Sequence, residues 1–180
     1  MKAVFREQGS EGDRNRDAVQ ERTVGGKSCG SCSLCCKVFD LPEFQKPADA
    51  WCRHCRPGKG CAIHGQERPN VCTSYRCMWL SSELPEKWKP DRCKFVLTEQ
   101  ASLNRVQVAV DCNFPDAWRK EPFYTQFRLW ARQGTIVSVF VGDRVTHLLP
   151  NGEEKVGKQA KPSAATSAEV AEIALMQSRK

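Results

Sequence analysis

Four cysteines fall within eight residues in the stretch CGSCSLCC, which runs from Cys29 to Cys36 and ends in an adjacent pair. This cluster constrains the fold more than any other feature, because thiols that lie so close together are reactive unless something binds them. The chain contains eleven cysteines in 180 residues, and ten of them lie between residues 29 and 93. What these thiols bind therefore decides how the first half of the chain folds.

The cysteines are predicted to bind a metal rather than to pair as disulfides. The first 28 residues contain no apolar segment with a cleavage site of the kind that directs export, so we expect a cytoplasmic protein. Disulfides persist mainly outside the reducing cytosol, and an odd count of eleven fits complete pairing poorly. No apolar run reaches the ~18 residues of a membrane span, so no association with a membrane is expected.

The spacing of the cysteines is typical of metal sites. Two residues separate the cysteines in Cys29-x2-Cys32-x2-Cys35 and again in Cys52-x2-Cys55, which lets two sulfurs from one tight turn reach the same ion. Nineteen residues separate Cys32 from Cys52 and 16 separate Cys35 from Cys52, and both intervals match a zinc ribbon, so the grouping stays open. The predicted metal ligands are Cys29, Cys32, Cys35, Cys36, Cys52, Cys55, Cys61, Cys72 and Cys77.

Cys35 and Cys36 are predicted to serve different sites, because successive side chains point apart in most backbone conformations. The chain then holds two metal sites or one polynuclear cluster with cysteines on two sides, unless one of the pair is a spare thiol. A bacterial ferredoxin pattern begins in the same way, but it needs three residues where Cys36 follows at once. His54 and His64 are alternative ligands. The predicted cofactor is zinc or iron, including an iron–sulfur cluster, at one or two sites.

The positive charge of the chain is interpreted as compensation for bound thiolates. The formal net charge is +7, and seven Lys or Arg against four Asp or Glu lie between Cys29 and Cys77, a surplus of three. Lys37, Arg68 and Arg76 are among the basic residues close to cysteines in the sequence. Because a metal ligand is the thiolate form of cysteine, such sites attract positive side chains. Nucleic acid is therefore not an expected partner.

The predicted fold class is α+β, with a single cysteine-cluster domain over residues 29–150 between two tails. Residues 29–93 form an irregular, metal-stabilised half with few apolar residues to bury, and residues 94–150 form a small antiparallel sheet with one packed helix. Residues 1–28 read as a disordered tail in which 14–21 can form a short helix. Residues 151–180 read as a polar tail, where Thr166 and Glu169 fit a capping box that opens another short helix.

The elements of the second half follow from periodicity and turn signals. KFVLT at 94–98 and the alternating VQVAVD at 106–111 predict strands, and TIVSVFV and RVTHLL predict a hairpin around Gly142 and Asp143. A helix is predicted from Pro122 to Gly134, with apolar residues at helical spacing. In the first half, Pro69 fits the start of a short helix that carries Cys72, Tyr75 and Trp79.

CGSCSLCC, followed by GKGCAIHGQERPNVCTSYRC, resembles the motif of the YkgJ-type cysteine-cluster family, described as a zinc- or iron-chelating domain. That motif is CxxCxxCC, then a lone cysteine after a small turn, then Arg-Pro-x-x-Cys with a tyrosine and another cysteine close behind. The matching residues are Cys29, Cys32, Cys35, Cys36, Cys61, Arg68, Pro69, Cys72, Tyr75 and Cys77. The resemblance implies bound zinc or iron, whereas Cys52 and Cys55 lie outside the motif. Some larger proteins with a similar domain are flagellin lysine methylases with an iron–sulfur cluster, but this chain shows no methyl-donor site.

Three functions are compatible with these features. The first is a metal-binding protein in which zinc or iron is structural, handled or sensed, with the metal ion and an unidentified protein as partners. The second is an iron–sulfur protein that acts as a redox or protein-modifying enzyme component. The third is a zinc-dependent module that binds nucleic acid or protein. The sequence shows no catalytic triad, paired carboxylates or phosphate-binding loop, so no enzyme activity is assigned.

Overall fold

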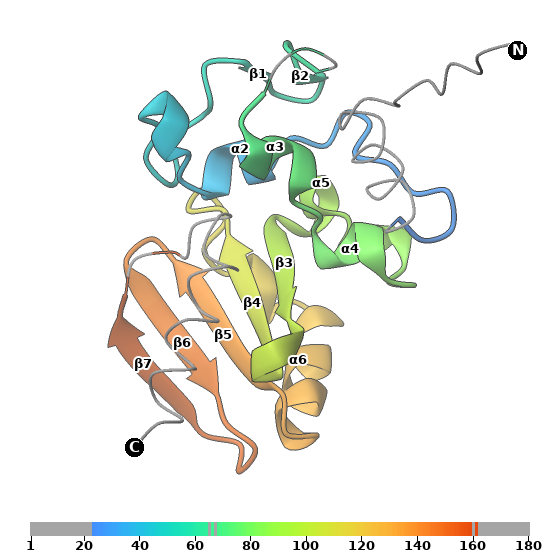
Figure 1. Ribbon diagram of the computed structural model, residues 1–180. Coiled ribbons are helices and arrows are strands. Elements are labelled where there is room, and N and C mark those ends of the chain that lie inside the picture. The colour runs from blue at the N-terminus through green and yellow to red at the C-terminus, as the bar shows by residue number, and fades with distance from the viewer. Residues whose placement is uncertain (1–22, 65, 67, 160, 162–180) are drawn as a thin grey trace, which may run out of the picture.

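The computed structural model describes residues 23–64, 66, 68–159 and 161 of the chain. Most of the predicted N-terminal tail, with its helix at 14–21, and the predicted helix opened by Thr166 lie outside the described residues. The fold is α+β, as the sequence predicts. A five-stranded sheet carries one long helix on one face, and the cysteine-rich segments gather at one end of the strands (Figure 1).

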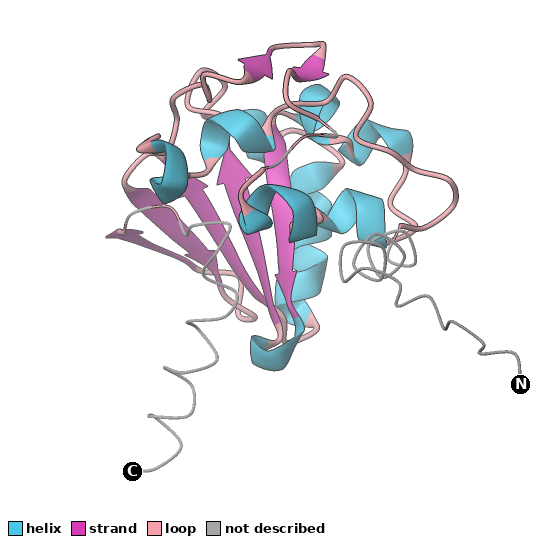
Figure 2. Cartoon of the chain, turned by 45° about the horizontal axis from the view of Figure 1, so that its top comes forward, coloured by secondary structure: helices cyan, strands magenta, loops and turns pink. Residues whose placement is uncertain are grey.

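The large sheet has the strand order β3-β4-β5-β6-β7, and it is mixed rather than antiparallel as predicted. Its strands are β3 (Phe95–Gln100), β4 (Arg105–Val110), β5 (Ile136–Val141), β6 (Arg144–Leu148) and β7 (Glu154–Lys158). β4 and β5 pair in parallel, with Val106 opposite Val137, while the other neighbours are antiparallel. The parallel pair arises because the segment between these strands crosses over the sheet and includes α6 (Phe123–Arg132) (Figure 2).

The predicted helix and hairpin are confirmed. α6 starts directly after Pro122, and Gly134 follows its end with φ +92°, a conformation in which glycine avoids steric strain. Phe127 on α6 is fully buried and packs edge-on against Phe95 of β3, with their ring centroids 5.6 Å apart. Gly142, with φ +60°, lies in the turn between β5 and β6. The second half of the chain therefore holds its shape through a packed hydrophobic core.

The sheet continues past the predicted domain boundary at residue 150, because β7 pairs with β6. Both guanidinium nitrogens of Arg119 donate to the carboxylate of Glu154, at 3.1 and 2.7 Å, and the hydroxyl of Tyr124 donates to it at 2.9 Å. The hydrogen bonds from Arg119 lower the pKa of Glu154, so the carboxylate is charged at neutral pH. Polar contacts thus anchor a strand whose sequence reads as a tail.

The cysteine-rich half is built from short elements. They are α2 (Cys35–Val38), the 3-10 turn η1 (Pro42–Phe44), β1 (Cys55–Arg56), β2 (Gly60–Cys61), α3 (Asn70–Ser74), α4 (Met78–Ser81), η2 (Glu86–Trp88) and α5 (Pro90–Cys93). Two further 3-10 turns, η3 (Ala101–Leu103) and η4 (Ala117–Arg119), lie in the second half. The helix predicted after Pro69 is confirmed as α3, but it ends at Ser74, so Trp79 belongs to α4 instead.

The cysteine-rich half shares part of the main core, contrary to the expectation that it has little to bury. Val38, Phe39 and Leu80 belong to the same buried cluster as the sheet residues. Between residues 41 and 72, by contrast, the buried hydrophobic residues of the described chain are Leu41, Cys52 and Val71. The shortage of hydrophobic core is therefore confined to this segment.

The last residues of the predicted N-terminal tail are attached to the domain. The backbone N–H of Val24 donates to the carbonyl of Leu80 at 2.9 Å, and the ammonium of Lys27 donates to the carbonyl of Leu84 at 2.7 Å. The ordered domain therefore begins before Cys29. In the part of the chain that the structure describes, no helix combines the length and the hydrophobicity needed to cross a membrane.

A buried ion pair joins the cysteine-rich half to the sheet. The ammonium of Lys37, on α2, lies 2.5 Å from a carboxylate oxygen of Asp111, directly after β4, and their side chains are 6% and 7% exposed. The same oxygen accepts the backbone N–H of Asn113 at 2.9 Å. Because neither charge is hydrated, each depends on the other, and α2 is fixed against the end of the sheet.

Replacing Asp111 by alanine is expected to lower the free energy of unfolding by about 3–5 kcal/mol, because the Lys37 ammonium then stays buried without its partner. Arg92→Ala is the control, since Arg92 and Glu86 form an ion pair whose side chains are 62% and 49% exposed; it should cost less than about 1 kcal/mol. Urea unfolding followed by circular dichroism measures both. Equal losses in the two variants would contradict a docking role for the Lys37–Asp111 pair.

Candidate thiolate metal centre

The nine cysteines predicted as ligands occupy one lobe at the end of the sheet. They lie on the loop before α2, on α2 itself, in and before the β1–β2 hairpin, on α3 and directly before α4, segments that Figure 1 shows gathered above the strands. All eleven cysteines of the chain are free thiols. The fold thus brings together residues that span almost fifty positions of the sequence.

Each CxxC pair forms a tight turn. The backbone N–H of Cys32 donates to the carbonyl of Cys29 at 2.8 Å, and the N–H of Cys55 donates to that of Cys52 at 2.9 Å. Gly30, inside the first turn, has φ +52°, which an L-residue adopts only with strain. These turns have the shape in which two sulfurs can approach one ion.

The β1–β2 hairpin adds a third cysteine and packs against the first turn. Cys55 lies directly opposite Cys61 in the antiparallel ladder, and opposite residues place their side chains on the same face. Gly60 has φ +93°, and a Cβ at this position would lie 3.2 Å from the carbonyl oxygen of Gly30. Glycine therefore allows the hairpin backbone to approach the Cys29–Cys32 turn.

The thiol of Cys36 is unusually acidic. Hydrogen bonding with Cys35, assisted by Cys55 and the nearby charge of Lys46, lowers the pKa of Cys36 to about 6 against the opposing effect of burial. The same bond, together with burial, raises the pKa of Cys35 well above its usual value. Cys36 therefore carries negative charge before Cys35 does.

Cys55, Cys72 and Cys77 resist ionisation. Burial, followed by the charge of Cys36, raises the pKa of Cys55 and of Cys72 to about 11. Burial likewise raises the pKa of Cys77 to about 11, and the charges of Cys29 and Cys32 add to it. Several thiolates can therefore exist together here only when a cation offsets their repulsion.

Lys46 supplies one such positive charge, and sequence analysis did not single it out. Its side chain is buried, and its ammonium donates to the carbonyl of Lys37 at 2.8 Å and to that of Phe39 at a shorter separation. Burial lowers the pKa of Lys46, while the charges of Cys52 and Cys36 oppose this shift. Lys37, which we expected to compensate thiolates, pairs instead with Asp111.

Arg68 and Arg76 do lie near the thiols, as the interpretation of the charge predicts. Their charges lower the pKa of Cys29 against the larger effect of burial, and Arg68 acts in the same way on Cys72. The Nε of Arg68 and the indole nitrogen of Trp79 are buried without a hydrogen-bond partner in the described residues. Both groups are hydrogen-bond donors whose partner is not among the described residues.

The remaining cysteines and the histidines have other contacts. Cys93 is buried, and its thiol donates to the carbonyls of Trp88 and Phe95 at 3.4 and 3.2 Å. Cys112 is exposed beside Asp49 and Lys161. The ring of His54 packs against Phe44 with centroids 4.9 Å apart, and His147 hydrogen-bonds to the Ser138 hydroxyl at 2.9 Å. The two cysteines outside the predicted ligand set thus have structural surroundings of their own.

The chemistry of the donor set fits a soft metal ion. Thiolates select zinc and iron–sulfur centres over magnesium and calcium, which prefer oxygen. Across residues 23–64, 66, 68–159 and 161, no group of three or more His, Cys, Asp or Glu has the geometry of a metal site. The described sulfurs of this centre therefore do not lie at coordination geometry.

The chain matches no protein-family model, no curated protein and no solved structure. The resemblance to the YkgJ-type family therefore stands on the motif residues themselves.

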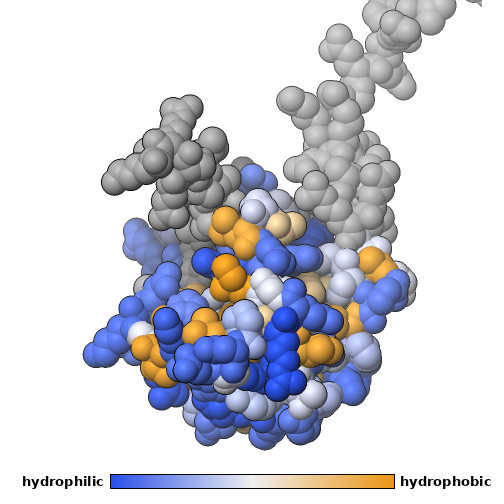
Figure 3. Space-filling model, turned by 90° about the horizontal axis from the view of Figure 1, so that it is seen from below, coloured by the Kyte–Doolittle hydropathy of each residue, from blue (hydrophilic) through white to orange (hydrophobic). Residues whose placement is uncertain are grey.

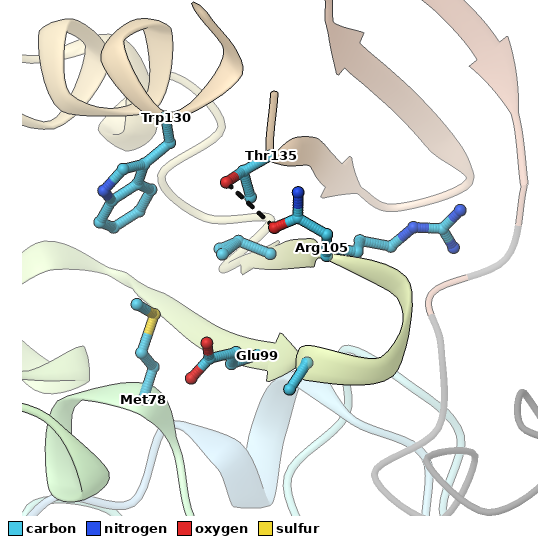
Figure 4. A pocket seen from close by; sticks show the side chains of 8 residues that line it. Met78, Glu99, Arg105, Trp130 and Thr135 are labelled. Atoms are coloured by element: carbon cyan, nitrogen blue, oxygen red, sulfur yellow. Dashed lines mark hydrogen bonds between the residues drawn. The ribbon is translucent and has the colours of Figure 1, made fainter. Parts of the chain in front are cut away.

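A second feature of the surface is a pocket of about 250 Å³ between α4, the β3–β4 hairpin and α6. Trp130 and Met78 reach toward each other from α6 and α4, and the Thr135 hydroxyl hydrogen-bonds to Asn104 at 3.4 Å (Figure 4). None of its lining residues is a cysteine, so it is not part of the thiolate centre. At the end of the sheet away from the cysteines, hydrophobic residues are scattered among hydrophilic ones (Figure 3).

Replacing Lys46 by methionine is expected to lower the free energy of unfolding by about 1.5–3 kcal/mol, because two carbonyls lose a charged hydrogen-bond donor. Lys59→Met makes the same charge change at an exposed position of the hairpin, and it should alter stability by less than about 0.5 kcal/mol. Chemical denaturation of both variants provides the comparison. A loss in Lys46→Met no larger than in Lys59→Met would show that the buried ammonium does not stabilise the lobe.

Proposed function

We propose that this chain is a cytoplasmic metal-binding protein in which the thiolates of the cysteine lobe hold zinc or iron. The observation that carries the proposal is the gathering of nine free thiols in a lobe whose segment 41–72 buries three hydrophobic residues, Leu41, Cys52 and Val71, within its described part. The role of the metal is structural, metal-handling or sensing. An unidentified protein is the expected partner.

Coordination can stabilise this segment more than packing can. A fully buried hydrophobic side chain stabilises a fold by about 1.5–3 kcal/mol, and the segment has three such residues. A structural zinc site contributes about 10–16 kcal/mol in small peptides. Coordination is therefore the larger stabilising contribution available to this segment, and without it the mutual repulsion of the thiolates opposes the arrangement.

The residues around the thiols fit this role. Bound zinc or iron supplies the positive charge that lets neighbouring thiols ionise together. Lys46 and Arg68 already bring positive charge to Cys36. The Nε of Arg68 is buried without a hydrogen-bond partner among the described residues, and a hydrogen bond to a coordinated sulfur would satisfy it. An iron–sulfur centre in a redox or protein-modifying component uses the same ligands, and the metal and sulfide content distinguishes it from zinc.

Tag-free protein purified anaerobically is expected to contain stoichiometric zinc or iron, measured by elemental analysis together with acid-labile sulfide. Colourless protein with zinc supports a zinc centre, whereas brown protein with iron and sulfide supports the iron–sulfur form. Cys72→Ser should lose metal and expose residues 41–72 to limited proteolysis, while the sheet keeps its protection. Cys112→Ser, at an exposed position outside the lobe, should keep both metal and protection. Native protein that holds neither zinc nor iron would overturn the proposal.

A further inference from the structure

The pocket of about 250 Å³ beside α6 has a carboxylate in its wall, in line with a row of buried hydrophobic residues. Side chains alternate between the two faces of a strand, so Phe95, Leu97 and Glu99 of β3 lie on the same face. Phe95 and Leu97 belong to the main core, and Phe95 packs against Phe127 of α6. Glu99 ends this row, where it is exposed and lines the pocket.

The carboxylate of Glu99 has no ion-pair or hydrogen-bond partner among the described residues. Arg105 also lines the pocket, but it precedes Val106, the residue opposite Glu99 in the ladder, so the two charged side chains leave opposite faces of the sheet. The Arg105 guanidinium accordingly extends away from the pocket, whereas the Glu99 carboxylate points toward the side formed by Trp130 and Met78 (Figure 4). The pocket thus presents an uncompensated negative charge.

The walls around this charge are held in place by the fold. The ring centroid of Trp130 lies 5.8 Å from that of Trp88 and 5.8 Å from that of Phe127, and these contacts fix the indole. The rim at the β3–β4 hairpin is fixed by Asn104, whose side-chain amide donates to the carbonyl of Gly134 at 3.1 Å. A ligand therefore meets walls that are already formed, which lowers the entropic cost of binding.

A carboxylate beside an indole ring and a thioether is a suitable environment for a guanidinium group. Guanidinium is planar and weakly hydrated, stacks on aromatic rings and pairs with a carboxylate through two N–H groups, whereas the ammonium of lysine is compact and strongly hydrated. The pocket volume of about 250 Å³ lies below the range of about 300–1,000 Å³ that is typical of small-molecule sites. The pocket therefore suits one side chain of a protein rather than a whole cofactor.

We propose that this pocket receives an arginine side chain of a partner protein, with the guanidinium stacked on Trp130 and paired with the carboxylate of Glu99. The indole supplies the aromatic face, the carboxylate supplies the opposite charge, and Met78 adds a polarisable contact. This site goes beyond the proposed metal binding, because none of the residues that line it is a cysteine. It gives the expected protein partner a chemical property, an exposed arginine.

The probe is N-acetyl-arginine amide, titrated at millimolar concentrations into the isotope-labelled full-length protein while NMR follows the indole N–H signals. The Trp130 signal is expected to shift to saturation, whereas blocked citrulline, which has nearly the same shape without the charge, should give no saturable shift. Trp51, which is 43% exposed, is the internal control for stacking on any accessible ring. Glu99→Gln should weaken binding by about tenfold, because a charged hydrogen bond becomes a neutral one. Glu43→Gln, the same change at an exposed position of the cysteine lobe, should leave the affinity unchanged.

Four results would each overturn the arginine site: no saturable shift of Trp130, equal shifts of Trp51 and Trp130, binding of blocked citrulline or blocked lysine as tight as that of blocked arginine, or unchanged affinity in Glu99→Gln. Because Glu99 is exposed, its replacement removes no core contact, so a loss of binding in that variant reports the carboxylate itself. The metal content of the protein is a separate measurement, and failure of the arginine site leaves the proposed metal binding intact.

Discussion

The buried ion pair between Lys37 and Asp111 is the interaction on which the arrangement of the cysteine lobe depends. It ties a four-residue helix, α2, to the end of a well-packed sheet, and an isolated helix of that length has no stability of its own in water. α2 in turn carries Cys35 and Cys36. Because Lys37 lies on α2 itself, its ion pair with Asp111 also fixes the orientation of the Cys35 and Cys36 side chains.

The two halves of the molecule are stabilised by different physics. The sheet and α6 enclose aromatic residues such as Phe95 and Phe127, which are fully buried. Close packing of this kind stabilises the sheet and its helix. The segment 41–72 has short elements, two-residue strands and a small cluster around Leu41. Polar contacts such as those of Lys46 help to order this segment. When its cysteines are thiolates, a positive charge is also needed to offset their repulsion. A cation bound there would therefore affect the lobe much more than the sheet.

Periodicity accounts for what could be predicted of the fold. The alternation in 106–111 and the helical spacing that follows Pro122 are local signals, and both elements are present. Periodicity could not predict that β4 and β5 pair in parallel, because the direction of pairing depends on the path of the chain between the two strands. β7 was missed because its residues are mostly exposed and polar, so it lacks the alternation that marks a half-buried strand, and its anchor, Arg119, is distant in sequence.

The sequence by itself determined which side chains are the candidate metal ligands, because thiol chemistry and the spacing of tight turns are local properties. It also placed Cys93 and Cys112 outside the ligand set, where the structure gives them contacts of their own. Only the tertiary structure decided which thiols are neighbours, that Asp111 rather than a thiolate receives Lys37, and that Lys46 lies beside Cys36. These facts arise from segments brought together by burial and charge pairing, and no spacing along the chain encodes them.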